Sequence, residues 1–218
     1  MNEVKPGLVG VIKGYLERYM ESQLCVTNLR MPVGTLVTGC KGVGITAHLN
    51  HLSQILCDHE QAEWLWAISD DCVFCPDLLE KLYNRDVDVI VPLIASDKYP
   101  YDPEIYDSSY QQVTIDWLKD KSGLVESDML FSWRGMLIRK SVLKEMVGPW
   151  FINGATLPEV AGSDLWFCEQ LHKKGIKVYL DMENTMGRIA HVSWWPSRLA
   201  DGAWQAKVHA SLPWGWIH

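Results

Sequence analysis

Short apolar runs alternate with segments of helical periodicity along most of this sequence. Residues 7–14, 35–39 and 64–69 are predicted strands, and residues 45–56 carry apolar side chains at the spacing of one helix face. This alternation is typical of α/β domains, in which helices cover a largely parallel sheet. We therefore expect a single α/β domain with a mostly parallel central sheet flanked by helices.

The second half of the chain interrupts and then resumes this pattern. Residues 87–96 predict a strand covered on both faces, in which Pro92 indicates a bulge or an early end. Residues 97–128 predict a long loop with a short strand or hairpin near residues 113–118, and such loops are often functional. The following segments predict a strand and helix over 129–146, a helix over 163–174 and a strand over 176–181.

Composition and length limit the classes of function. A chain of 218 residues can bury one good core, and its net charge of -7 argues against a general affinity for polyanions. No apolar run approaches the ~20 residues that span a bilayer, and the first residues do not form a signal peptide. The six cysteines do not form a secreted disulfide pattern, so we expect reduced thiols and a cytoplasmic protein.

Two adjacent carboxylates, Asp70 and Asp71, follow the strand predicted at residues 64–69. Ligands of open α/β sheets bind beyond the carboxyl ends of the strands, so this pair is the first candidate for a site. Neighbouring carboxylates stay ionised most easily beside a cation, and a hard divalent metal ion is the usual partner. A helix-capping aspartate beside a solvated one explains the pair equally well.

Five segments resemble, in order, the motifs of family 2-like glycosyltransferases of the GT-A type. LWAISDDCVFCPDLLEKL resembles the DxD region, and the helix before it is similar to the family's helix that carries an Arg-Asn pair. SWRGMLIRKSVLKEM resembles the central strand and its following helix. GSDLWFCEQLHKKGIKVYLD resembles the Glu-Asp helix, and GRIAHVSWW resembles the late histidine segment. Together these segments cover roughly residues 7–195.

Each acidic or amide motif departs from the family at its first position. In this chain the DxD motif reads Ser69-Asp70-Asp71, the Arg-Asn pair reads Leu49-Asn50, and the Glu-Asp pair reads Ser163-Asp164. The last position of every motif is kept. The resemblance therefore gives most weight to Asp71 and Asp164.

The resemblance implies a metal-dependent, inverting transferase that uses a nucleotide-diphosphate sugar, with a UDP-sugar favoured. It implies that Asp71 and His191 hold Mn²⁺ or Mg²⁺ and that Asp164 is the base. The resemblance also implies a set of donor-binding residues, namely Asn50, Ser69, Asp70, Trp133 and Gly135. If Asp71 only holds a metal ion, Asp71→Asn should weaken donor binding and leave the melting temperature close to that of the parent.

Structural explanations compete at several of these positions. His191 is also explained as a partly buried histidine beside tryptophans, and Asp164 as an acid favoured in the first turn of a helix. Trp133 and Gly135 are equally explained by packing.

By this reasoning residues 1–195 form the GT-A-like nucleotide-sugar-binding and catalytic domain, and residues 196–218 form a tryptophan-rich extension that packs on it. The acceptor is a glycan or, as in small virus-encoded relatives acting in the host cytoplasm, a hydroxymethylated DNA base. A nucleotidyltransferase and a non-catalytic nucleotide-sugar-binding module are the alternatives. The former usually has a glycine-rich basic loop after its first strand, where this chain has only Lys13-Gly14.

Overall fold

The fold is described from a computed structural model of the chain. The structure describes residues 4–12, 19–40, 44–96, 100–153, 162–189 and 193–209. His191 and the end of the tryptophan-rich tail therefore lie outside the described residues.

A central sheet of mixed direction organises the molecule. In spatial order its main strands are β2 (Leu36–Cys40), β1 (Leu8–Ile12), β3 (Trp64–Ser69), β9 (Leu137–Arg139), β5 (Val89–Ile94) and β10 (Val178–Ile189). β1 pairs in parallel with β2 and β3, and β5 pairs in parallel with β10. The short strand β9 is antiparallel to both β3 and β5, so all the other main strands run the same way. The fold is thus α/β with a mostly parallel sheet, as predicted.

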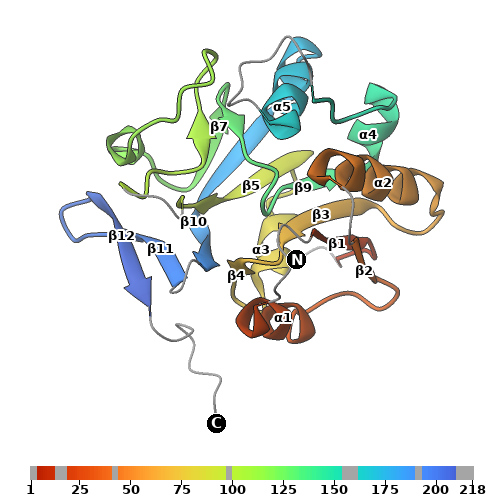
Figure 1. The fold of residues 1–218 in the computed structure, drawn as a ribbon, viewed down its shortest axis with the longest axis horizontal. Coiled ribbons are helices and arrows are strands. Elements are labelled where there is room, and N and C mark those ends of the chain that lie inside the picture. The colour runs from red at the N-terminus through yellow and green to blue at the C-terminus, as the bar shows by residue number, and fades with distance from the viewer. Residues whose placement is uncertain are drawn as a thin grey trace.

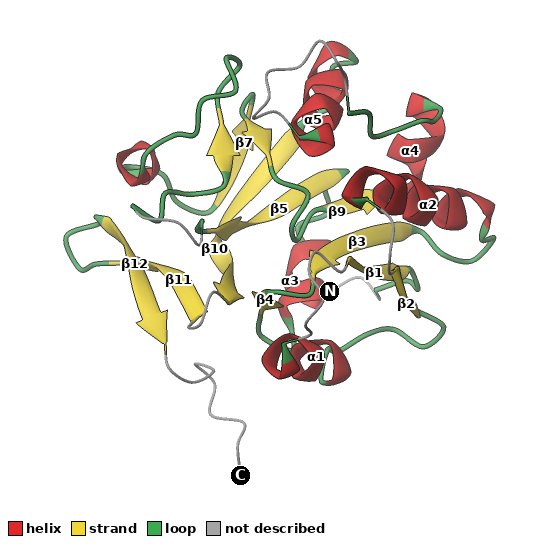
Figure 2. Cartoon of the chain, viewed as in Figure 1, coloured by secondary structure: helices red, strands yellow, loops and turns green. Residues whose placement is uncertain are grey.

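Shorter strands extend this sheet at its β10 side. β4 (Cys72–Val73) and β7 (Leu124–Ser127) each pair with β10, and β6 (Ile105–Tyr106) pairs separately with β8 (Leu130–Phe131). β11 (Ser193–Arg198) and β12 (Trp204–His209) continue the sheet beyond β10 as an antiparallel pair. Figure 2 shows this pair at the side of the molecule away from α2 and α4.

Helices cover both faces of the sheet (Figure 1). α2 (Ile45–Asp58), α4 (Lys140–Met146) and α5 (Ser163–Lys173) pack on one face, and α1 (Met20–Thr27) and α3 (Leu78–Tyr83) on the other. A 3-10 helix, η1 (Ile115–Leu118), lies in the long connection after β5.

Each face of the sheet has its own hydrophobic cluster, because side chains alternate along a strand. In β3, Leu65 joins the cluster beneath α2, α4 and α5, while Trp64 and Trp66 join the one beneath α1 and α3. Every residue of β3 is buried. A strand covered on both faces has to be apolar throughout, which explains why WLWAIS was easy to recognise.

Local predictions met different outcomes. The strands expected at residues 7–14, 35–39 and 64–69 and the helix at 45–56 are confirmed. The hairpin expected near residues 113–118 is wrong, because that segment forms η1. β5 continues through Pro92, and the irregularity is carried by its partner β10, whose register shifts between Asp181 and Thr185.

The C-terminal strands bear on the predicted division at residue 195. β11 runs across that boundary, Trp195 is buried in the cluster beneath α1 and α3, and Trp204 packs against the cluster on the other face. The division therefore remains a prediction, and within the described part of the tail the chain continues the main sheet. None of the described helices has both the length and the apolar character needed to cross a bilayer. Of the cysteines whose side chains the structure describes, five are free thiols, namely Cys25, Cys57, Cys72, Cys75 and Cys168.

We predict that Gly135→Ala destabilises the fold far more than Gly123→Ala. Both glycines have positive φ, 76° and 69°, so alanine is strained at either position. A Cβ on Gly135 would lie 2.5 Å from Sδ of Met186 and 2.7 Å from Cγ of Pro92, whereas one on Gly123 meets nothing within 4 Å. We expect a loss of about 3 kcal/mol against about 1 kcal/mol in urea unfolding. Equal losses of unfolding free energy in the two variants would show that packing does not require glycine at position 135.

Candidate active site

The candidate site begins where β3 ends. Asp70 and Asp71 follow Ser69 directly, and the Asp70 amide donates to the carbonyl of Ile12 at the end of β1. The chain then forms β4, which pairs antiparallel with β10 so that Cys72 lies opposite Arg188. This pairing brings the side chain of Arg188 next to Asp71.

Asp71 and Arg188 form a buried ion pair. Nη2 of Arg188 donates to Oδ2 of Asp71 at 2.6 Å, and Nε donates to the same oxygen at 3.2 Å. The side chain of Arg188 is 5% exposed and that of Asp71 is 3% exposed. The thiol of Cys72 lies 3.7 Å from the other carboxylate oxygen, as a weak donor.

Glu104 and Arg134 complete what we term the charged cluster, consisting of Asp71, Glu104, Arg134 and Arg188. Oε1 of Glu104 accepts from Arg188 at 2.7 Å, and its Oε2 accepts from Arg134 at 3.2 Å. Nε of Arg134 is 3.9 Å from Oδ1 of Asp71. With two carboxylates and two guanidinium groups, the cluster is formally neutral, which buried charges require.

Electrostatics within the cluster favour the ionised forms. Burial would raise the pKa of Asp71, but Arg188 and Arg134 outweigh it and hold this pKa below its usual value. Burial would lower the pKa of Arg188, and here Glu104 and Asp71 outweigh it, so the pKa is raised. Each charge is therefore stabilised by its neighbours.

Asp164 lies in the first turn of α5, close to this cluster. Its Oδ2 accepts from the backbone amide of Trp133 at 3.2 Å. Burial raises its pKa above the usual value, and the Trp133 amide and Arg134 offset only part of that effect. Burial also raises the pKa of Tyr106 to about 12, with smaller contributions from Glu104 and Asp164. Asp164 and the charged cluster thus share one electrostatic environment.

Asn50 acts as a structural clamp in this arrangement. Its Oδ1 accepts from the amides of Trp150 and Phe151 at 2.8 and 3.1 Å, and its Nδ2 donates to the Phe151 carbonyl at 2.6 Å. One turn earlier on α2, the hydroxyl of Thr46 lies 2.8 Å from that of Ser163 at the start of α5. α2 therefore positions the helix that carries Asp164.

The other predicted donor-binding residues are largely buried. Ser69, Asp70 and Trp133 are 3%, 6% and 4% exposed, and the Ser69 hydroxyl helps to lower the pKa of Asp71. Met186 and Pro92 fill the space where Gly135 would carry a side chain. Packing thus accounts for Trp133 and Gly135, and their roles in donor binding stay predictions.

The described residues do not fit the expected metal site at Asp71. Oδ2 of Asp71 already accepts two bonds from Arg188, and Oδ1 faces Cys72 and Arg134. Among the residues that the structure describes, no three His, Cys, Asp or Glu side chains converge as metal ligands. His191 lies outside those residues, so its role stays a prediction.

Sequence reasoning missed Glu104, Arg134 and Arg188. Both arginines lie inside apolar segments that matched family motifs, and a charge in such a segment signals a buried partner. Glu104 gave no such signal, because it lies in the irregular stretch between β5 and η1 and meets the arginines only in the folded chain.

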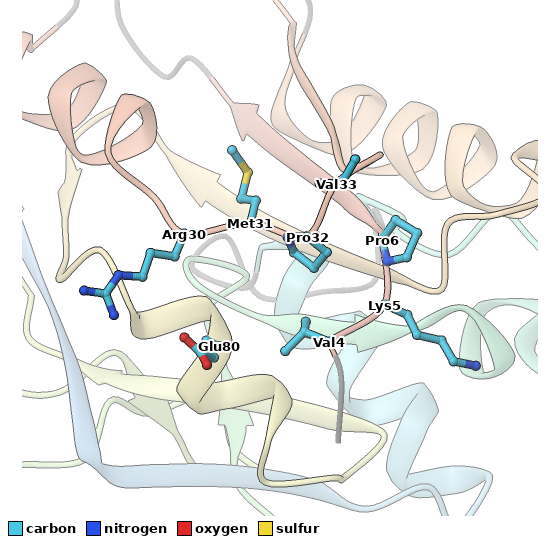
Figure 3. Close-up of a pocket in the computed structure, with 8 residues that line it drawn as sticks. All are labelled: Val4, Lys5, Pro6, Arg30, Met31, Pro32, Val33 and Glu80. Carbon is cyan, nitrogen blue, oxygen red and sulfur yellow. The ribbon is translucent and has the colours of Figure 1, made fainter. Parts of the chain in front are cut away.

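A separate hollow of about 580 Å³ lies at the amino end of β1, lined by residues 4–6, residues 30–33 and Glu80 (Figure 3). Lys5 and Arg30 point their charged groups to opposite sides of it. The hollow therefore does not gather cations around one ligand position, and the charged cluster remains the better candidate site.

Comparison with known proteins points to a single fold. No family model matches this sequence, and no curated protein matches it either. Among solved structures, A197 from STIV matches with a TM-score of 0.62 at 10% identity, over 92% of this chain and 94% of its own. GalNAc-T7, in a crystal structure with UDP, GalNAc and Mn²⁺, matches with a TM-score of 0.60 at 12% identity. That match covers 87% of this chain but 45% of GalNAc-T7.

The chain has a GT-A-like glycosyltransferase fold. Both matches are below 25% identity, so the GT-A-like architecture is what they establish. In this GT-A-like fold, the charged cluster includes Asp71 just beyond the end of β3, and Asp164 lies close to that cluster.

We predict that Asp71→Asn destabilises the protein, contrary to the expectation from the sequence alone. The substitution leaves Arg188 buried with one carboxylate fewer, and breaking a buried pair costs about 3–5 kcal/mol. Glu126→Gln is the matched control, because Glu126 pairs with Lys177 at the surface, where the two side chains are 51% and 60% exposed. That change should cost less than ~1 kcal/mol. Chemical denaturation measures both, and similar small losses would contradict the structural role of Asp71.

Proposed function

We propose that this protein transfers a sugar from a nucleotide-diphosphate donor to an acceptor hydroxyl, with Asp164 as the base. The position of Asp164 carries the proposal, since it lies in the first turn of α5 beside the charged cluster, in a fold shared with GalNAc-T7. This residue geometry and the GT-A-like fold together are the main support for the proposal.

The surroundings of Asp164 suit a general base. The Trp133 amide fixes Oδ2, and a Cβ on Gly162 would lie 2.3 Å from Oδ1, so the glycine at the helix N-cap leaves room for the carboxylate. Burial raises the pKa of Asp164 above its usual value, which makes the ionised carboxylate a stronger proton acceptor.

One base and one direct displacement give an inverting reaction. The acceptor oxygen attacks the anomeric carbon, its proton passes to Asp164, and the nucleoside diphosphate leaves with the electron pair of the broken bond. Negative charge therefore develops on phosphate oxygens, and cationic groups at this edge of the sheet stabilise it.

A UDP-sugar, carrying a hexose or a pentose, is the proposed donor, because the GalNAc-T7 structure that matches this chain contains UDP and GalNAc. The acceptor is proposed to be a glycan or a hydroxymethylated DNA base. The net charge of -7 favours the glycan, since DNA binding is dominated by phosphate contacts with cations.

Thermal shift with UDP, GDP, CDP and their sugars tests donor binding. A ligand that binds only the folded protein raises its apparent stability by mass action, so we expect the UDP compounds to raise the melting temperature selectively. Donor hydrolysis would then distinguish an enzyme from a non-catalytic binding module. If no nucleotide shifted the melting temperature, the proposed function would be wrong.

We predict that Asp164→Asn lowers donor turnover by roughly 10²-fold or more while donor affinity changes little. Asparagine keeps an acceptor for the Trp133 amide but cannot take a proton. Glu80→Gln in the first turn of α3 is the control for a purely helix-stabilising acid, and it should leave turnover unchanged. Turnover is measured as release of nucleoside diphosphate, and near-normal turnover of Asp164→Asn would show that Asp164 is not the base.

The pH dependence of turnover provides an independent test. Because only the ionised carboxylate accepts a proton, kcat/KM should fall as pH decreases through the pKa of Asp164, which burial places above the usual value of 3.8. The fall should therefore begin at higher pH than for an exposed aspartate. A rate that stayed constant down to pH 3.8 would exclude Asp164 as the group that titrates.

A further inference from the structure

The charged cluster lies where the sequence resemblance suggests a metal site. Sequence resemblance assigns Asp71 to a divalent cation, whereas in the structure Asp71 binds Arg188 at 2.6 Å. Arg188 and Arg134 also share Glu104, which accepts from one at 2.7 Å and from the other at 3.2 Å. The positive charges at the end of β3 are thus part of the protein chain.

We infer that Arg134 and Arg188 take the place of a divalent metal ion, with Arg134 binding the diphosphate of the donor. This inference rests on the proposed function, because it concerns the donor of the same site. Donor binding would then need no metal.

Charge compensation is the first reason. A metal ion at Asp71 would have to displace Arg188, whose side chain is 5% exposed, and would leave this buried charge with Glu104 as its remaining carboxylate in the cluster. As the structure stands, the two carboxylates of the cluster are already neutralised. The arginines therefore neutralise the negative charges of Asp71 and Glu104, which would otherwise repel an incoming diphosphate. No metal ion is needed to offset that repulsion.

Arg134 is the member of the cluster best suited to contact phosphate. Its side chain is 21% exposed, against 5% for Arg188. Its Nη1 donates to Glu104 and to Ser132, and its buried Nε lies 3.9 Å from Asp71 with no hydrogen-bond acceptor among the residues that the structure describes. An arginine presents its donors as a planar fork that matches phosphate oxygens, so the exposed part of the Arg134 side chain can contact a diphosphate while Glu104 and Asp71 hold its buried part.

Glu104 and Asp71 are positioning residues in this scheme. Glu104 joins the two guanidinium groups, and its backbone is tied to β5, since its amide donates to the carbonyl of Ile94. Asp71 is fixed by the β4–β10 pairing. When the bond between the anomeric carbon and the leaving oxygen breaks, the electron pair stays on the diphosphate, and Arg134 stabilises that charge.

Isothermal titration of the full chain with UDP, GDP and CDP, in excess EDTA and in Mn²⁺, tests the inference. We expect at least one nucleotide to bind with equal affinity in both conditions. Arg134→Gln should weaken that binding at least tenfold, and Arg134→Lys should weaken it less because it keeps the charge but loses the fork. Arg30→Gln, at an exposed arginine of the separate hollow, is the control and should bind as the parent does.

Other outcomes have separate meanings. Binding that requires Mn²⁺ and is lost in His191→Ala would overturn the inference in favour of a metal site, while leaving the proposed function intact. Unchanged binding by a folded Arg134→Gln variant would remove Arg134 from the donor site. If none of the three nucleotides bound in either condition, the proposed function itself would fail. The comparison of EDTA with Mn²⁺ uses the parent protein, so it decides the metal question even if Arg134→Gln does not fold.

Discussion

The ion pair between Asp71 and Arg188 is the interaction on which the candidate site depends. It forms because β4 turns back directly after β3 and pairs with β10, which places a strand-end carboxylate against an arginine 117 residues later in the chain. Both groups are nearly inaccessible to water, so removing either one leaves the other as an unpaired buried charge and destabilises the fold. Glu104 and Arg134 then follow as the additional charges that keep the cluster neutral and hydrogen-bonded.

Asp164 is positioned by a different set of contacts. Asn50 fixes the backbone at Trp150 and Phe151, and Thr46 meets Ser163, so α2 sets where α5 begins. The amide of Trp133, in the connection between β8 and β9, then orients the carboxylate of Asp164. Asn50 and Trp133, which the sequence suggested as donor-binding residues, thus help to position Asp164. Asp164 lies in the same electrostatic environment as Arg134.

Much of the fold could be predicted because burial leaves a pattern in the sequence. β3 and β5 are apolar on both faces, and α2 repeats its buried leucines at helical spacing. The segment at Ile115–Leu118 was misassigned because a single turn of 3-10 helix is too short to produce a periodic signal. The C-terminal strands were missed for a related reason, since the sequences SWWPSR and WQAKVH do not alternate apolar and polar residues with a period of two.

The sequence by itself determined the α/β class, the acidic end of β3 and the aspartate that begins α5, because each depends on residues that are neighbours along the chain. Only the tertiary structure decided what those carboxylates contact. Arg188 reaches Asp71, and Glu104 joins Arg188 to Arg134, through pairings between segments far apart in sequence. Whether a strand-end aspartate binds a metal ion or an arginine depends on which charge folding brings within hydrogen-bonding distance, and local sequence carries no record of that distance.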